Sequence, residues 1–253
     1  MKRTLAGMAF SLACLMNLSE AQTMNNDTSA LSPKEQQIAA ISAHTARGDM
    51  PGLRNALTAG LDAGLTLNEL KEVLVQMYAY CGFPRSLNAL NELMVLAKDR
   101  ASRGINDTVG AEAGAPPAGK SIDFGTANQT KLCGAPVKGD LFLFAPAIDE
   151  FLKAHLFGDI FGRDNMDWKT REFATIAALA AMTGTESQLN SHIRIGKHNG
   201  LTDGQVEAIL AVSAAAGKKD AFPKGEPAPA NFTGKAWVAM LVDNRDYDMS
   251  AYN

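Results

Sequence analysis

Apolar residues recur at helical spacing along most of the chain, and several of these runs begin with a recognisable helix start. Ser32 is a capping residue, Pro33 stands at the first helical position, and Glu35 follows three residues after the cap. Thr66 and Glu69 repeat the capping pattern. The patterns predict helices over residues 32–48, 53–63, 66–81, 87–101, 147–157, 168–182, 187–199 and 203–216. No convincing strand-like alternation occurs before residue 220, so the main body is predicted to be all-α.

One stretch of the pattern occurs twice. Gly64, Leu65 and Thr66 precede one predicted helix, and the same three residue types precede another at 200–202, an offset of 136 residues. Each threonine is followed three positions later by an acid or amide, Glu69 in one copy and Gln205 in the other. The simplest explanation is duplication of a three-helix unit, which predicts one helical repeat over residues 30–104 and a second over residues 141–217.

The segment between the repeats, residues 105–140, is rich in Gly, Ala, Pro, Asn and Thr and has little periodicity. This composition predicts a linker or a wrapping arm. After the second repeat, residues 218–253 begin with a proline-rich stretch, and residues 231–242 alternate like a strand. We therefore expect an extended, strand-like C-terminal tail.

The N-terminus has the layout of a secretory signal peptide. Lys2 and Arg3 precede an apolar stretch that ends at Leu18, and Ser19 and Ala21 are small residues placed for cleavage before residue 22. The stretch is too short to span a membrane. The sequence thus predicts a signal peptide at residues 1–21, export to the periplasm, and no membrane attachment after cleavage.

Charge and metal-ligand spacing exclude some classes of function. The net charge is −3, and no Lys/Arg cluster is longer than two residues, so nucleic-acid binding is not expected. Four histidines and three cysteines show no Cys-x-x-Cys or His-x-x-x-His spacing, so no metal is expected. Cys14 lies in the predicted signal peptide. Cys81 and Cys133 remain, and they could form one disulfide or stay free and buried.

Several ordered features resemble a known family. Glu172 follows an arginine at the start of an alanine-rich helix that ends near Gly184, and His192 comes before the repeated Gly-Leu-Thr at 200–202. Residues 69–74, 80–84 and 88–90 carry the likeness in the first repeat. The set resembles the carboxymuconolactone decarboxylase and alkylhydroperoxidase D family, which implies two all-α repeats. The tail looks like the opening strand of the cupin domain that some members carry.

The resemblance implies an acid–base site at Glu172 and His192. A histidine can pass a proton near neutral pH, and a partly buried carboxylate can orient it. The implied substrate is a small carboxylated lactone or related organic acid, and the implied reaction needs no cofactor. A cation should hold the substrate carboxylate, and we consider three candidates, Arg171, Arg194 and Arg163. His155 could line the same pocket or be an ordinary buried histidine.

The sequence also departs from the family pattern. The peroxidase branch has a Cys-x-x-Cys pair just before the histidine, where this chain has Thr185 and Gln188. The first repeat has Ala56 at the histidine position but holds Cys81. One alternative is therefore a thiol-dependent, peroxiredoxin-like peroxidase that acts on a peroxide through Cys81, with Cys133 as the resolving thiol. A second alternative is a non-catalytic, partner-binding member. The resemblance also implies a homo-oligomer, a trimer of tandem chains.

Overall fold

The computed structural model describes residues 30–217, 226–227 and 237–238. The predicted signal peptide and most of the predicted tail lie outside these residues. The described part is all-α, as predicted, apart from strands β1 (Glu226–Pro227) and β2 (Trp237–Val238), which form a two-residue antiparallel pair. None of its helices combines the length and the apolar character that a membrane span requires.

The first repeat holds four helices, and its caps form as the sequence predicts. Ser32 and Glu35 exchange side-chain and backbone hydrogen bonds at the start of the first helix, and Thr66 and Glu69 do the same at the third. The last helix begins before residue 87, because Pro84 is accommodated in its first turn. The elements are α1 (Pro33–Arg47), α2 (Met50–Asp62), α3 (Leu67–Cys81) and α4 (Phe83–Ser102).

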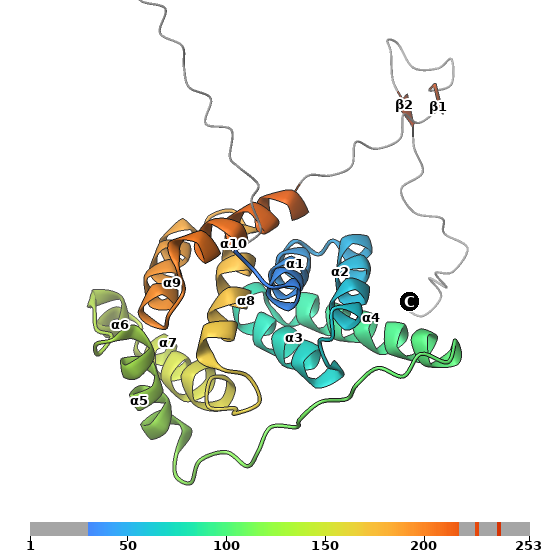
Figure 1. Ribbon diagram of the computed structural model, residues 1–253. Helices are drawn as coiled ribbons and strands as arrows, with labels where there is room; N and C mark the ends of the chain where they lie inside the picture. The colour runs from blue at the N-terminus through green and yellow to red at the C-terminus, as the bar shows by residue number, and fades with distance from the viewer. Residues whose placement is uncertain (1–29, 218–225, 228–236, 239–253) are drawn as a thin grey trace, which may run out of the picture.

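The segment between the repeats is only partly a linker. After α4 the chain runs along the outside of the molecule, and it then forms α5 (Ser121–Cys133) inside the stretch predicted to be irregular (Figure 1). Few apolar residues mark this helix, so its periodicity is weak. It forms against a neighbour: the backbone at Gly125 approaches the carbonyl of Lys153 so closely that a Cβ there would lie 1.9 Å from the carbonyl oxygen.

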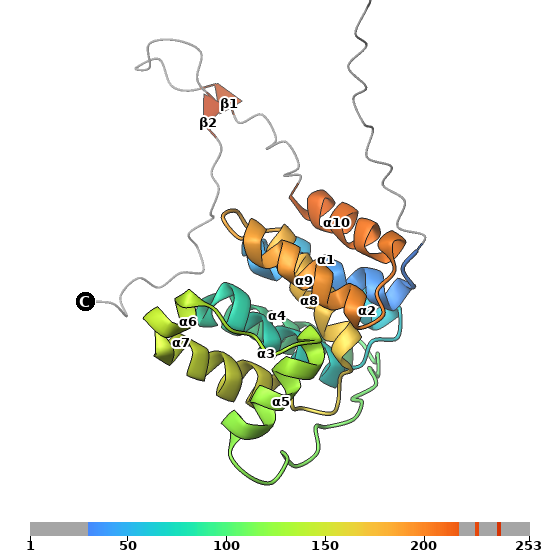
Figure 2. The ribbon, with the colours of Figure 1, turned by 90° about the vertical axis from the view of Figure 1, so that its left-hand side faces the viewer.

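The helix predicted over residues 147–157 also differs from the structure. It consists of α7 (Pro146–Phe151) followed directly by a π-helix, η1 (Leu152–Ile160), and short α6 (Asp140–Phe144) precedes both. The hydrogen bonds of a π-helix join residues five apart, and this spacing continues at the end of η1, where Phe161 N donates to Leu156 O at 2.9 Å. Helices α5, α6 and α7 form a group beside the main bundle in both views (Figures 1 and 2).

The second repeat places one helix in the centre of the molecule. This helix, α8 (Trp168–Ala180), packs against α1, α3, α9 (Glu186–His198) and α10 (Asp203–Ala216), and its residues 171–179 are all buried (Figure 1). The repeats also exchange contacts, because α3 packs on α8 while α10 packs on α1. A helix covered on every side has room for polar residues only where each finds a partner.

Two apolar clusters support this arrangement. The larger one joins both repeats around α1, α3 and α8. The smaller one fixes α5 and η1 to the face where α3, α8 and α9 meet, and consists of Leu132, Leu156, Phe157, Ile160 and Phe161, with Tyr78, Tyr80, Leu152, Trp168 and Ile195 packed against them.

Candidate active site

Glu172 and His192 come together at the junction of α8 and α9. The connection at Gly184 has a left-handed backbone, with φ at 78°, and lets α9 pack back along α8. His192 Nδ1 lies 2.8 Å from Glu172 Oε2. The Glu172 side chain is 0% exposed and the His192 side chain is 13% exposed. The pair is therefore buried on the carboxylate side and accessible only at the imidazole.

This contact leaves one imidazole nitrogen for chemistry. An ionised carboxylate can only accept a hydrogen bond, so His192 Nδ1 donates the proton in the contact. Among the described residues, Nε2 of the same ring has no hydrogen-bond partner and is not a fully buried atom. Glu172 thus sets the tautomer and orientation of the ring, and Nε2 is the atom that can take up or release a proton.

The first repeat contributes Tyr80 to the same place. The edge of its ring meets the imidazole of His192, with ring centroids 5.5 Å apart and planes at 82°. Burial, together with the Glu172 carboxylate, raises the pKa of the Tyr80 hydroxyl far above its usual range; nearby Thr175 offsets this only in part. Tyr80 was not predicted from the sequence. It lies within residues 80–84, which carry the family resemblance, but only the adjacent cysteine had an assigned chemistry.

The two cysteines in the described part of the chain are free, so they do not form a disulfide. Cys81 Sγ donates to Met77 O at 3.1 Å within its own helix. Burial raises the pKa of this thiol to about 11, and the charge of Arg85 lowers it only in part. Burial and then the Glu172 carboxylate raise the pKa of Cys133. The Cys133 thiol at the end of α5 is therefore within electrostatic range of the Glu172–His192 pair.

Two of the three arginines considered for substrate binding are engaged elsewhere. Arg171 is fully buried, and its Nη2 donates to Glu72 Oε1 at 2.8 Å. Arg163 Nε lies 2.9 Å from both carboxylate oxygens of Glu72. Glu72 belongs to α3, so both arginines join the second repeat to the first. We assign them to holding the repeats together, a role that the sequence could not show because 91 and 99 residues separate the partners.

The remaining two predicted substrate residues lie on the surface. Arg194 is exposed, and its Nη2 donates to Ser191 Oγ at 3.0 Å. Because it is two residues from His192 on α9, its side chain leaves the helix on nearly the opposite face. His155 on η1 is exposed and pairs with Asp159 Oδ2 at 2.8 Å. No hydrogen bond or ring contact within the described part joins it to His192.

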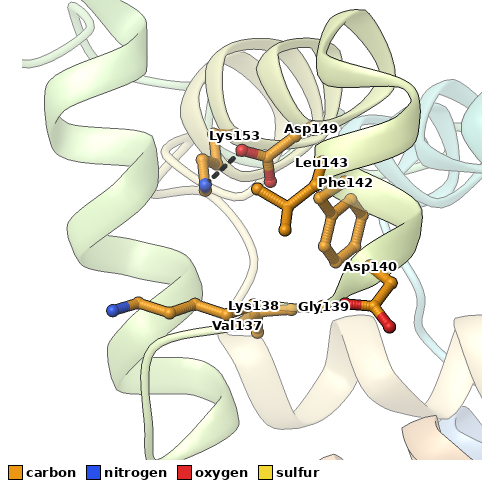
Figure 3. A pocket seen from close by; sticks show the side chains of 8 residues that line it. All are labelled: Val137, Lys138, Gly139, Asp140, Phe142, Leu143, Asp149 and Lys153. Carbon is orange, nitrogen blue, oxygen red and sulfur yellow. Dashed lines mark hydrogen bonds and ion pairs between the residues drawn. The ribbon is translucent and has the colours of Figure 1, made fainter.

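A cavity of about 320 Å³ lies away from this pair, where the α5–α6 turn faces α7 and η1. Figure 3 shows Lys153 paired with Asp149 on one side of it, while Lys138 extends away from that pair. None of the predicted site residues lines this cavity. Within residues 30–217, no cluster of three or more His, Cys, Asp and Glu residues could hold a metal ion. The lining residues are Val137, Lys138, Gly139, Asp140, Phe142, Leu143, Asp149 and Lys153.

Fold and site together define a tandem-repeat helical protein whose second repeat carries a buried carboxylate–imidazole pair. The sequence model of the carboxymuconolactone decarboxylase family matches residues 14–93 and 146–228, which is more than half of the 253 residues. The chain therefore belongs to the carboxymuconolactone decarboxylase family, as the sequence resemblance predicted. A comparison with curated proteins found no matching relative.

Proposed function

We propose that this protein is an enzyme that decarboxylates a small carboxylated lactone or a related organic acid. His192 acts as the general acid–base, and Glu172 orients it and supports its charged form. The observation that carries the proposal is the buried contact between His192 Nδ1 and Glu172 Oε2 at 2.8 Å, which leaves Nε2 available. Proton transfer by a positioned imidazole contributes about 10²- to 10⁴-fold to the rate of such reactions.

The reaction uses these two side chains in a defined order. The carboxylate stands on a ring carbon that is α to the lactone carbonyl or conjugated with it through a ring double bond. The bond from this carbon to the carboxylate breaks, carbon dioxide leaves, and the electron pair moves into the lactone carbonyl to form an enolate. His192, protonated on both nitrogens, then gives its Nε2 proton to the carbon, and solvent restores that proton. The net reaction consumes one proton and needs no cofactor, because the substrate's own carbonyl holds the electron pair. The Glu172 carboxylate stabilises the imidazolium that donates.

The test is turnover of carboxylated γ-lactones, followed as carbon dioxide release. We expect His192→Ala and Glu172→Gln each to lower kcat by about 100-fold or more. His44→Asn is the matched control, because His44 Nδ1 also lies 2.8 Å from a carboxylate, Asp49, and its side chain is 17% exposed. It should keep the wild-type rate. Full turnover in the His192→Ala variant would contradict the assignment of His192 as the general acid–base.

The alternative peroxidase is less well supported. Peroxide reduction needs a thiolate, and burial holds the pKa of Cys81 at about 11, so the thiol stays protonated at neutral pH. Its Sγ is also engaged with Met77 O within α3. The partner-binding alternative explains the first repeat, where Ala56 replaces histidine, but not the buried Glu172–His192 pair of the second repeat.

The proposal extends to location and assembly. The first 21 residues support export to the periplasm, since they follow the layout of a signal peptide. Large apolar side chains gathered on α6 and α7 support self-association, since exposed patches of this kind mark contacts between proteins. A second copy of this chain is the occupant that we propose, in a homo-oligomer of three chains. The residues, between 44% and 89% exposed, are Leu141, Leu143, Phe144, Ile148 and Phe151.

A further inference from the structure

Two oxygen atoms beside His192 are buried and have no hydrogen-bond partner in the described part of the chain. They are Tyr80 Oη and Glu172 Oε1. Buried polar atoms are nearly always paired in folded proteins, so unpaired ones call for an explanation, such as a ligand or an ordered water. Here the two atoms belong to residues that both approach the same imidazole, because Glu172 holds its Nδ1 and Tyr80 meets its ring edge.

The three side chains come from different repeats. Tyr80 lies in the last turn of α3 in the first repeat, whereas Glu172 and His192 lie on α8 and α9 of the second. At the repeat offset of 136 residues, the position equivalent to Tyr80 is Ala216, and the position equivalent to His192 is Ala56. The related interface, where α10 packs on α1, therefore lacks this combination, which forms where α3 packs on α8.

Tyr80 is suited to donate a hydrogen bond rather than a proton. Burial and the Glu172 carboxylate raise the pKa of its hydroxyl, so the phenol remains neutral over the pH range in which an imidazole works. A neutral donor that is buried beforehand needs no rearrangement when negative charge appears on a nearby oxygen. Thr175 lies near enough to the Tyr80 hydroxyl to lower its pKa in part, but Thr175 Oγ1, which accepts from Gln76 Nε2 at 2.9 Å, makes no hydrogen bond with Tyr80 Oη in the described part of the chain.

Resting on the decarboxylation described above, we propose that Tyr80 is a third catalytic residue, whose hydroxyl donates a hydrogen bond to the lactone carbonyl oxygen of the substrate. Negative charge develops on this oxygen when the carbon–carboxylate bond breaks and carbon dioxide leaves. The Tyr80 proton stays on its own oxygen throughout. When His192 protonates the carbon, the carbonyl re-forms and the hydrogen bond returns to its initial strength.

The first experiment compares Tyr80→Phe with the wild-type protein in the lactone assay. Phenylalanine keeps the ring against His192 and removes only the hydroxyl. We expect kcat to fall by about 100-fold, the loss typical of one oxyanion donor, with little change in KM and with the pH profile set by His192 unchanged. Thermal stability should be equal or higher, since an unpaired buried hydroxyl is removed. Tyr78→Phe is the control, because Tyr78 lies on the same helix and stacks on Phe83, with ring centroids 4.2 Å apart.

The second experiment separates this inference from the proposed function. Tetronate is a stable enolate of a five-membered lactone, and its binding can be measured by calorimetry without turnover. We expect Tyr80→Phe to bind it at least tenfold more weakly than the wild-type protein, and Tyr78→Phe to bind it equally well. Tyr80-dependent binding without any turnover would support Tyr80 as the hydrogen-bond donor to an enolate oxygen and count against the decarboxylation. Equal binding by Tyr80→Phe, or no binding by the wild-type protein, would overturn the inference.

Discussion

At the scale of single residues, burial rather than contact distance distinguishes the histidines of this chain. Three of them hold a carboxylate oxygen 2.8 Å from Nδ1. The carboxylate is fully buried only at His192; at the other two pairs the acid is 39% and 48% exposed. Water screens an exposed pair, whereas a buried carboxylate acts on its imidazole at nearly full strength. The pairs are His44–Asp49, His155–Asp159 and His192–Glu172.

The first prediction at this scale concerns Cys81. With its pKa raised from 9.0 to about 11, this thiol should react with iodoacetamide at pH 8 about a hundredfold more slowly than an unperturbed thiol. The reaction is slower because only the thiolate reacts with the reagent. The thiolate fraction rises about tenfold per pH unit and levels off only near the raised pKa. Mass spectrometry of labelled peptides measures the rate at Cys81. A rate equal to that of a free model thiol would contradict the prediction and support the alternative of a thiol-dependent peroxidase.

At the scale of elements, the unexpected helix α5 depends on a close backbone contact. Its Gly125 packs on η1, where a Cβ would lie 1.9 Å from Lys153 O and 2.7 Å from Gly158 N. Both of these are backbone atoms, which cannot move aside as a side chain can. The small size of glycine therefore determines how closely α5 approaches the π-helix, and with it the position of Cys133 at the end of α5.

Gly125→Ala should therefore displace α5. We expect a loss of about 1–3 kcal/mol in the free energy of unfolding, the range for overpacked sites. Labelling of Cys133 should become faster, because the displaced helix exposes its thiol. Denaturant titration and cysteine labelling measure the two effects.

The control for this substitution is Gly204→Ala in α10. There a Cβ would meet only Ala30 Cβ at 3.6 Å, an ordinary contact. This change should leave stability unchanged or raise it by up to about 1 kcal/mol, as alanine favours helix over glycine. Equal stability in the two variants would contradict the proposed role of Gly125.

At the scale of the whole molecule, the two repeats have diverged while keeping their mutual packing. Where α3 meets α8, Glu72 holds Arg171 at 2.8 Å and Gln76 Nε2 donates to the Arg171 carbonyl at 2.9 Å. At the repeat offset of 136 residues, the positions equivalent to Glu72 and Gln76 hold Ala208 and Val212. The interface between α3 and α8 is thus polar at these positions, whereas the related interface between α10 and α1 is apolar. The acid–base pair lies beside the polar interface.

Self-association is the prediction that belongs to this scale. Light scattering should give about three times the chain mass for the wild-type protein. Replacing both Leu143 and Phe144, which are 80% and 89% exposed, with glutamate should reduce this to the mass of one chain. Met94→Glu, at an apolar position of α4 that is 48% exposed, should not change it. A monomeric wild-type protein would refute the assembly.

The sequence by itself determined the features whose causes are local. Capping pairs such as Ser32 with Glu35 act within one helical turn, so most helices lie within a few residues of their predicted bounds. The duplication and the family could be predicted from the sequence for the same reason, and the family pattern indicated Glu172 and His192 as candidate site residues. All of these signals lie in short, contiguous stretches of chain.

Tertiary structure decided what depends on contacts between distant segments. Burial of Glu172 depends on the helices packed around α8, and both the approach of Tyr80 to His192 and the pairing of Arg171 with Glu72 join the two repeats. Helix α5 exists because η1 covers it, which a weak local pattern could not predict. Whether a charged or polar side chain serves chemistry or holds the fold together is set by its neighbours in space, because burial and pairing change its hydration and its pKa.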